Sequence, residues 1–177
     1  MTGAPPAPSG AAILAAVKQA GVRHVVALPD IVTSDGLLWP VARDPDLHLT
    51  RVAKEDEGVS ICAAMSYSGV RAVLMMQQTG LMDSLNAIRA IGMDYGLPVV
   101  MLVGLQGKEP DRAIEDSAAY GVRIVPAVLS AMDLPFSRIE RAGDEACVAG
   151  VIEGAYARSG PHCVLIGQPP AVPEAAA

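Results

Sequence analysis

An acidic run opens a predicted helix in the first third of the chain. Residues 54–57 have the sequence KEDE, and Glu57 precedes Ile61 and Cys62 by one to two helical turns. Acidic residues in a first turn are favoured by the helix dipole, so this run could serve structure alone. The helical spacing also predicts that Glu57 lies near the apolar side of an Ala-rich helix. Partial burial there would raise the pKa of its carboxyl group and suit it to proton transfer.

Polar residues follow two of the predicted strands. Pro29 and Asp30 close the apolar stretch 24–28, and the sequence QQTG follows the apolar stretch 72–76. Such residues often form turns or cap helices. Ligands of a parallel α/β sheet, however, bind outside the carboxyl ends of its strands. The candidate site residues beside Glu57 are therefore Asp30, Gln78, Thr79, Gly80 and Asn86.

Several kinds of site are disfavoured by the sequence. No glycine-rich phosphate-binding loop follows the first predicted strand, and no GxxxxGK[ST] motif occurs. The three histidines lie in or beside predicted strands, without a serine or cysteine nucleophile signature, at His24, His48 and His162. The cysteines form neither a CxxC pair nor a Cys/His cluster, so we expect no metal ligands in this chain. A self-sufficient nucleotide enzyme and a hydrolytic triad are both unsupported.

Short apolar strands alternate with amphipathic helices along the chain. Strands are predicted at residues 24–28, 47–52, 72–76, 99–103, 136–139 and 163–166. Helices are predicted from a Ser9 cap to a Gly21 stop and at residues 34–43, 55–68, 80–93, 126–132 and 144–158. This alternation predicts an α/β fold with a doubly wound, mainly parallel sheet of about six strands flanked by helices. We expect one domain over residues 9–167, a flexible arm over residues 1–8 and a flexible tail over residues 168–177.

The composition fits a globular protein of 177 residues with a sizeable core. Apolar residues make up 51% and charged residues 18% of the chain. Thirteen Lys and Arg against nineteen Asp and Glu give a formal charge of −6, which disfavours nucleic acid and anionic membranes as partners. No apolar run reaches the ~20 residues of a membrane span, and no secretory signal opens the chain. Together with three widely spaced cysteines, these features predict a cytoplasmic protein.

The order of several segments resembles the thiamine-diphosphate enzymes. Residues 57–64 read EGVSICAA and are similar to the E-x₅-A-A helix of their pyrimidine-binding domain, and residues 96–104 resemble the strand that comes later in that domain. The segments VALPD, MQQTGL and RIVPAVL more closely resemble sulfopyruvate and phosphonopyruvate decarboxylases; they lie at residues 26–30, 76–81 and 123–129. The similarity covers nearly the whole chain.

The resemblance implies a thiamine-diphosphate-dependent 2-oxo acid decarboxylase. Such enzymes bind the cofactor between two domains of similar fold, one holding the aminopyrimidine and the other holding the diphosphate through Mg²⁺ and a GDG motif. This chain has no GDG sequence and is long enough for one such domain. It therefore resembles the α subunit of the sulfopyruvate decarboxylases, which forms a hetero-oligomer with a separate diphosphate-binding β subunit of similar size. The expected reaction converts the small 2-oxo acid sulfopyruvate to sulfoacetaldehyde and CO₂.

The resemblance also assigns roles to the candidate residues. Glu57 would share a proton with N1′ of the aminopyrimidine, which is the activating step of the family. Asp30 would approach the substrate and could take part in proton transfer. The cofactor or the contact with the partner subunit would be lined by Gln78, Thr79, Gly80 and Asn86.

Two alternatives stay open. Related decarboxylases often carry a histidine shortly before the segment at 123–129, where this chain reads EDSAAYG. Its absence leaves phosphonopyruvate, another 2-oxo acid or carboligation open, with the final proton donor unassigned. An anionic substrate group would favour cationic partners, for which the nearest candidates are Lys108, Arg112 and Arg123. In the other alternative the chain is a non-catalytic, flavodoxin-like binding module, and Glu57 is only an acid at a helix start.

Overall fold

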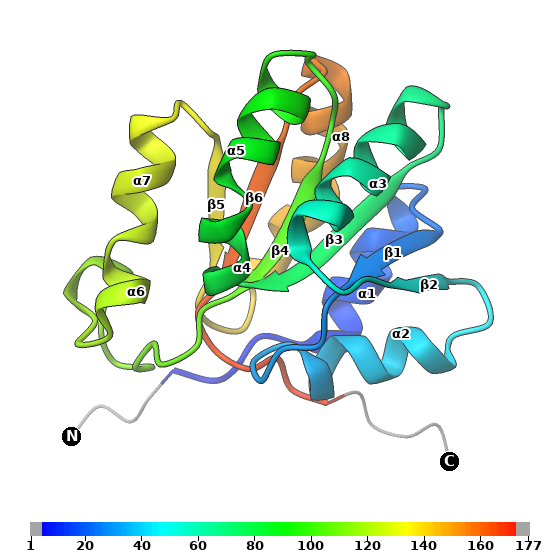
Figure 1. Cartoon of the computed structure of the whole chain (residues 1–177). Helices are drawn as coiled ribbons and strands as arrows, with labels where there is room; N and C mark the ends of the chain where they lie inside the picture. The colour runs from blue at the N-terminus through cyan, green and yellow to red at the C-terminus, as the bar shows by residue number, and fades with distance from the viewer. Residues whose placement is uncertain (1–4, 173–177) are drawn as a thin grey trace.

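The computed structural model describes residues 5–172, which fold around one six-stranded sheet (Figure 1). The strands are β1 (His24–Ala27), β2 (His48–Arg51), β3 (Ala72–Gln77), β4 (Val100–Gly104), β5 (Phe136–Ile139) and β6 (His162–Ile166). Their order is β2-β1-β3-β4-β6-β5, and every neighbouring pair is parallel. This confirms the predicted doubly wound α/β fold and places the carboxyl ends of these strands at one edge of the sheet.

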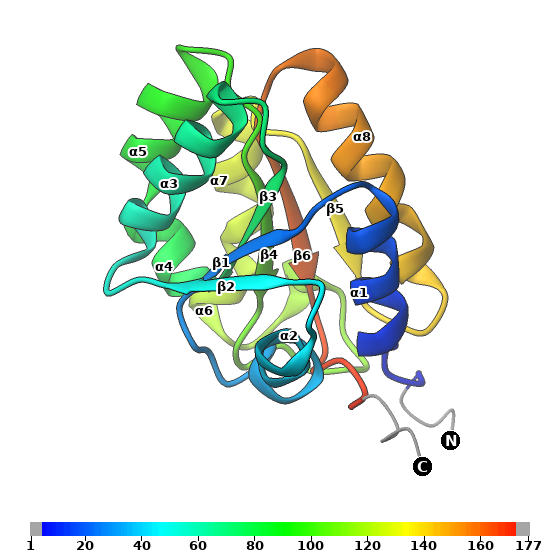
Figure 2. The same cartoon turned by 90° about the vertical axis from the view of Figure 1, so that its right-hand side faces the viewer.

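Helices cover both faces of the sheet (Figure 2). One face carries α1 (Gly10–Gln19), the wide helical turn η1 (Ser34–Leu38), its continuation α2 (Trp39–Arg43) and α8 (Val148–Arg158). The other face carries α3 (Glu55–Tyr67), α4 (Gln78–Asp83), α5 (Leu85–Ala87), η2 (Ile88–Met93), α6 (Tyr120–Arg123) and α7 (Val125–Ala131). The remaining described elements are the short turns η3 (Ile114–Asp116) and η4 (Asp144–Cys147).

The central strands are buried because helices cover both of their faces. β4 is buried along its whole length, and β3 is buried along all but its last residue. Alternate residues of β3 join different cores: Val73 and Met75 belong to the core under α1 and α8, whereas Leu74 and Met76 belong to the core under α3 and α4. A strand with two buried faces is apolar throughout, which is why short continuous apolar runs predicted a parallel sheet correctly.

The predicted helices differ from the observed ones mainly at their ends. Ser9 caps the first helix as predicted, since its Oγ accepts the N–H of Ala12 at 3.2 Å, and Gly21 follows the helix with a φ of +76°. The helix predicted over residues 80–93 begins two residues earlier, at Gln78. The pattern does not predict α6, because a single helical turn is too short to show a 3.6-residue period.

The described parts of the two terminal segments pack against the domain. Ala171 donates a backbone hydrogen bond to the oxygen of Pro8 at 2.8 Å, and its own oxygen accepts the N–H of Gly10 at 3.0 Å. A Cβ added to Gly10 would lie 2.2 Å from the carbonyl oxygen of Gly36 in η1. These hydrogen bonds and close contacts hold Pro8 and Ala171 against the start of α1, and the flexible arm and tail stay predictions.

The rest of the predicted arm and tail, residues 1–4 and 173–177, lies outside the described residues. Between residues 5 and 172, no helix combines the length and the apolar character needed to cross a membrane.

Candidate functional site

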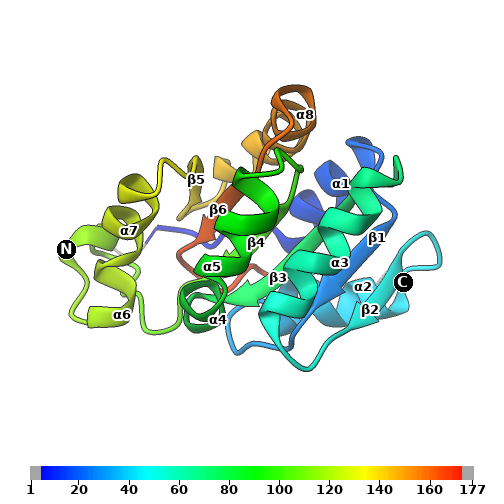
Figure 3. The same cartoon turned by 45° about the horizontal axis from the view of Figure 1, so that its top comes forward.

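The loops after β1, β3 and β4 come together at the carboxyl edge of the sheet. β2 lies on one side of β1 and β3 lies on the other, so the switch in strand order falls at β1 and β3. Such a switch point opens the crevice in which doubly wound proteins bind ligands. The helices α3 and α4 begin at this edge, and Figure 3 shows them in front of the sheet together with α5.

Glu57 closes a hydrogen-bonded cap at the start of α3. Its Oε2 atom accepts the backbone N–H groups of Ala53 and Lys54 at 3.1 and 3.2 Å, and its own N–H donates to Asp56 Oδ1 at 3.0 Å. Lys54 has the extended backbone of an N-cap residue, which lets the carboxylate three residues later fold back onto the preceding chain. Oε1, in contrast, accepts no hydrogen bond from residues 5–172.

The expected partial burial of Glu57 is wrong for the isolated chain. The residue is exposed, because its side chain turns back toward the start of the helix and away from the buried stripe of Val59, Cys62 and Ala63. Helical side chains point toward the helix N-terminus, so spacing alone places the Cα atom and not the carboxylate. Glu57 therefore meets solvent in this chain and could meet a second molecule at the same place.

Asp30 organises the loop after β1. Its buried carboxylate accepts the backbone N–H groups of Val32 at 2.7 Å and Thr33 at 2.8 Å, and also the hydroxyl of Thr33. The loop reaches across to β4, because a Cβ added to Gly104 would lie 2.9 Å from Asp30 Oδ1. Both carboxylate oxygens thus bind the loop itself, and Ile31 is left 73% exposed. A role for Asp30 in proton transfer stays a prediction.

Gln78 joins the start of α4 to the loop after β4. Its buried amide donates to the backbone oxygen of Gln106 at 3.1 Å and accepts the backbone N–H of Gln106 at 2.8 Å. Thr79 is exposed beside it, and its hydroxyl accepts a hydrogen bond from the side chain of Gln77 at 2.9 Å. Gln78 therefore links α4 to the loop after β4, and Thr79 is the residue of this turn that a bound molecule could reach. Binding roles for both stay predictions.

The remaining two candidates lie further along the same segment. Gly80 is the buried third residue of α4 and packs against the side chain of Glu55. Asn86 lies on α5, where its exposed Oδ1 accepts hydrogen bonds from Nη2 and Nε of Arg89 at 3.0 and 3.3 Å. Gly80 thus lies at the same edge of the sheet as Glu57, whereas Asn86 lies beyond the end of α4. Binding roles for both stay predictions.

Lys108 is held inside the chain. Its side chain is 1% exposed, with Nζ 3.0 Å from Oε1 of Glu140 and donating to the backbone oxygen of Glu109 at 2.9 Å. Arg123 donates to a backbone oxygen of the same loop at 2.7 Å, and Arg112 is exposed with a guanidinium nitrogen 3.7 Å from Glu109. Because its charge is paired and buried, Lys108 is a poor partner for an anionic substrate group.

An acid that the sequence did not single out organises the loop after β4. Glu109 accepts the hydroxyl of Ser117 at 2.7 Å and the N–H of Ala118 at 3.0 Å. These bonds, with a smaller contribution from the charge of Arg112, lower the pKa of its carboxyl group to about 2. Its main partners lie eight and nine residues further along the chain, so no local spacing pattern identifies Glu109.

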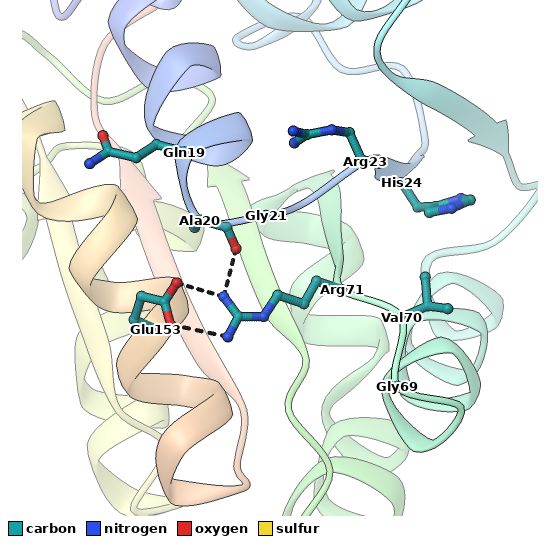
Figure 4. A pocket seen from close by; sticks show the side chains of 9 residues that line it. All are labelled: Gln19, Ala20, Gly21, Arg23, His24, Gly69, Val70, Arg71 and Glu153. Carbon is teal, nitrogen blue, oxygen red and sulfur yellow. Dashed lines mark hydrogen bonds and ion pairs between the residues drawn. The ribbon is translucent and has the colours of Figure 1, made fainter.

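A polar pocket of about 540 Å³ lies at the opposite, amino edge of the sheet (Figure 4). Arg71 spans it: Nη1 donates to the Ala20 oxygen and to Glu153 Oε1, both at 2.6 Å, and Nη2 donates to Glu153 Oε2 at 3.1 Å. The guanidinium carbon also lies 4.9 Å from the centre of the Tyr156 ring. Because these contacts join the start of β3 to α1 and α8, the pocket is a structural junction.

The sheet and its edge define a class of protein. This is a doubly wound α/β domain in which a glutamate, hydrogen-bonded through one carboxylate oxygen, lies beside the switch point. Proteins of this class bind their ligands at that point. Over residues 5–172, no three His, Cys, Asp or Glu side chains are grouped so that they could hold a metal ion. No protein-family model matches the chain.

Comparison with curated proteins identifies the family. Sulfopyruvate decarboxylase subunit alpha of Methanothermobacter thermautotrophicus is 30% identical over 128 residues, which cover 72% of this chain and 76% of the relative. Sulfopyruvate decarboxylase of Methanosarcina acetivorans is 28% identical over 157 residues, covering 87% of this chain and 38% of the relative. Sulfopyruvate decarboxylase subunit alpha of Methanococcus maripaludis is 28% identical over 96 residues, covering 54% of this chain and 57% of the relative. The chain belongs to the sulfopyruvate decarboxylase alpha-subunit family, which confirms the resemblance.

Proposed function

We propose that this chain is the pyrimidine-binding subunit of a thiamine-diphosphate-dependent decarboxylase that converts sulfopyruvate to sulfoacetaldehyde and CO₂. Its family supports the substrate and the reaction. The observation that carries the proposal is the geometry of Glu57. Two backbone amides anchor one oxygen of its carboxylate, and the other oxygen accepts no hydrogen bond from residues 5–172.

The Glu57 carboxylate fits the chemistry of an aminopyrimidine ring. A ring nitrogen that exchanges a proton with the protein needs a carboxyl group of fixed orientation with an unoccupied oxygen. The hydrogen bonds from Ala53 and Lys54 hold Oε2 and leave Oε1 to meet the ring. The neighbouring wall of the site would come from the start of α4, at Thr79 and Gly80.

Proton exchange at Oε1 is the role that we assign to Glu57. When bound, thiamine diphosphate supplies the electron sink for the loss of CO₂ from a 2-oxo acid. In the isolated chain water reaches Glu57 and competes for its hydrogen bonds. A partner subunit that covers the carboxyl edge would exclude this water, so we infer that the site is complete only in the assembly.

We infer that a separate β subunit of similar size holds the diphosphate and Mg²⁺. Two of the relatives are named as alpha subunits, which implies a partner in those proteins. The longer relative has no subunit in its name, and more than half of its length lies outside the part that this chain matches. In a hetero-oligomer, the β subunit would supply the diphosphate-binding domain as a separate chain.

We also infer that the protein works in the cytoplasm. Its cysteines are free thiols rather than disulfides, as a reducing compartment requires, at Cys62, Cys147 and Cys163.

Reconstitution of activity tests the proposed function. The chain is combined with a GDG-bearing partner chain, thiamine diphosphate and Mg²⁺, and CO₂ release is measured with sulfopyruvate, phosphonopyruvate and pyruvate. Glu57→Gln is expected to lower kcat by at least about 100-fold, because the amide keeps the shape but cannot exchange the proton. The two subunits should still co-elute. Asp46→Asn, which changes an exposed acid beside Lys18, is the matched control and should keep the kcat of the wild type.

Each possible result has a distinct meaning. A fully active Glu57→Gln complex would contradict the role assigned to Glu57. CO₂ release from phosphonopyruvate or pyruvate, but not from sulfopyruvate, would replace the proposed substrate. A complex that assembles and acts on no 2-oxo acid would favour the non-catalytic binding module.

A further inference from the structure

The side chain of Glu55 lies over Gly80, two residues before Glu57 on the same helix. A Cβ added to Gly80 would lie 2.0 Å from Oε1, 2.1 Å from Cδ and 2.3 Å from Cγ of Glu55. The end of the Glu55 side chain therefore occupies the space that glycine leaves open at the third residue of α4. Glu55 is half-buried there, whereas Glu57 is exposed.

The first turn of α3 is held on another side by the sheet. A Cβ added to Gly58 would lie 2.5 Å from Cδ1 of Leu74, a residue of β3. Glu55 and Gly58 thus place the turn that carries Glu57 in close contact with both α4 and β3. A shift of this turn would move Glu57 relative to the amides that hold its Oε2 atom.

We propose that Glu55 is a positioning residue for Glu57, and that it acts by filling the space over Gly80. This inference rests on the proposed function, in which Glu57 presents one oxygen to the cofactor. With Glu55 in place, the packed turn keeps the amides of Ala53 and Lys54 within hydrogen-bonding distance of Glu57 Oε2. Without it, a void opens between α3 and α4, and the surrounding turn relaxes into the void.

Gly80→Ala displaces Glu55 by a second, independent route. The atoms in the way of the new methyl group are the end of a flexible side chain near solvent, so Glu55 can rotate out and the fold survives. Alanine also favours a helix more than glycine does. In the double variant Glu55→Ala/Gly80→Ala, the new methyl group takes part of the vacated space. The double variant should therefore be no more impaired than either single variant.

Hydrogen exchange at the backbone amides of Ala53 and Lys54 reports this effect in the isolated chain. Glu55→Ala and Gly80→Ala are each expected to speed exchange at both amides about three- to tenfold, by weakening the local cap. The double variant should exchange no faster than either single variant. Glu55→Gln keeps the shape of the side chain, so both amides should exchange at the slower wild-type rates in that variant. Gly150→Ala is the matched control, because a Cβ there would meet no atom of residues 5–172 within 4 Å, and it should leave both rates unchanged.

The reconstituted enzyme gives the second measurement. Glu55→Ala and Gly80→Ala should each lower kcat about tenfold and change the KM for sulfopyruvate by no more than about twofold, because a displaced Glu57 affects chemistry more than substrate binding. Unchanged amide exchange in Glu55→Ala, a wild-type kcat in that variant, or additive defects in the double variant would overturn the positioning role. A wild-type complex without decarboxylase activity would instead contradict the proposed function, and amide exchange would still decide the role of Glu55.

Discussion

Two glutamates in one helical turn, Glu55 and Glu57, face different surroundings. Glu57 folds back onto the amides of Ala53 and Lys54, whereas Glu55 lies over Gly80. Helical spacing and the resemblance to thiamine-diphosphate enzymes predicted Glu57 as the candidate acid. They did not predict its cap, because a lysine stands at the N-cap position where Ser or Thr is usual. The direction of a side chain in the first turn depends on the residues before the helix. Helical spacing takes no account of those residues, so it could not predict where the Glu57 carboxylate points.

His162, at the start of β6, leads us to expect a loss of stability in mild acid. Its Nε2 lies 2.9 Å from Ser137 Oγ, and its Nδ1 lies 3.2 Å from Nη2 of Arg158. Burial, together with the positive charge of Arg158, lowers the pKa of the imidazole to about 4. Between about pH 6.5 and pH 4 the unfolded chain binds a proton that the folded chain does not, so the free energy of unfolding falls as the pH is lowered through this range.

Urea denaturation at about pH 7 and about pH 5 measures this loss. Most ordinary carboxyl groups stay ionised at both pH values, and comparison with a variant that lacks the imidazole subtracts what the carboxyl groups contribute. His162→Asn removes the titrating group and should lose less stability than the wild type between the two pH values. An equal loss in both proteins would show that His162 is not responsible.

At the scale of elements, strands were easier to predict than the start of α4. Strands buried on both faces give continuous apolar runs, and β5 has the predicted bounds, residues 136–139. Residues 77–79 are polar and read as a turn, yet Gln78 is buried and begins a helix. Its amide is satisfied by the backbone of Gln106, 28 residues away. A local sequence pattern contains no information about a partner so far along the chain. A polar residue such as Gln78 is therefore predicted to be exposed when it is in fact buried.

The paired amide of Gln78 leads to a stability prediction. Gln78→Ala should lower the free energy of unfolding by about 2 kcal/mol, because it leaves the N–H and the oxygen of Gln106 without their partner. Gln77→Ala is the matched control, since within the described part of the chain that side chain bonds only the exposed hydroxyl of Thr79, and it should change stability by less than about 0.5 kcal/mol. Urea denaturation of both variants checks the difference; equal stabilities would mean that the Gln78 pairing contributes nothing.

At the scale of the whole molecule, the fold class could be predicted but the packing of the terminal segments could not. Alternating strands and helices are visible along the chain, and they specify the layers of the sheet. Proline-rich composition shows only that a segment is neither helix nor strand. It does not show that Pro8, Gly10 and Ala171 bond to one another, because that contact forms only once β6 and α1 lie in the same fold.

Gly10→Ala tests how tightly these segments are joined. The new Cβ would lie 2.2 Å from the Gly36 oxygen and 2.8 Å from the Ala171 oxygen, and backbone atoms cannot rotate away as a side chain does. We expect a loss of about 2 kcal/mol or more in the free energy of unfolding. Gly150→Ala, with open space around the new atom, should be neutral or more stable by up to about 1 kcal/mol. Thermal unfolding compares the two, and a Gly10→Ala variant as stable as the wild type would rule out the close packing.

The pairing of Ala171 with Pro8 and Gly10 also decides where the chain leaves the sheet. β6 ends at the carboxyl edge, and Figure 1 shows the segment after it on the lower side of the molecule, where α3 and α4 also begin. A second domain joined after residue 172 would therefore start on the side that carries Glu57. A gene fusion would need no long linker to bring such a domain over the site.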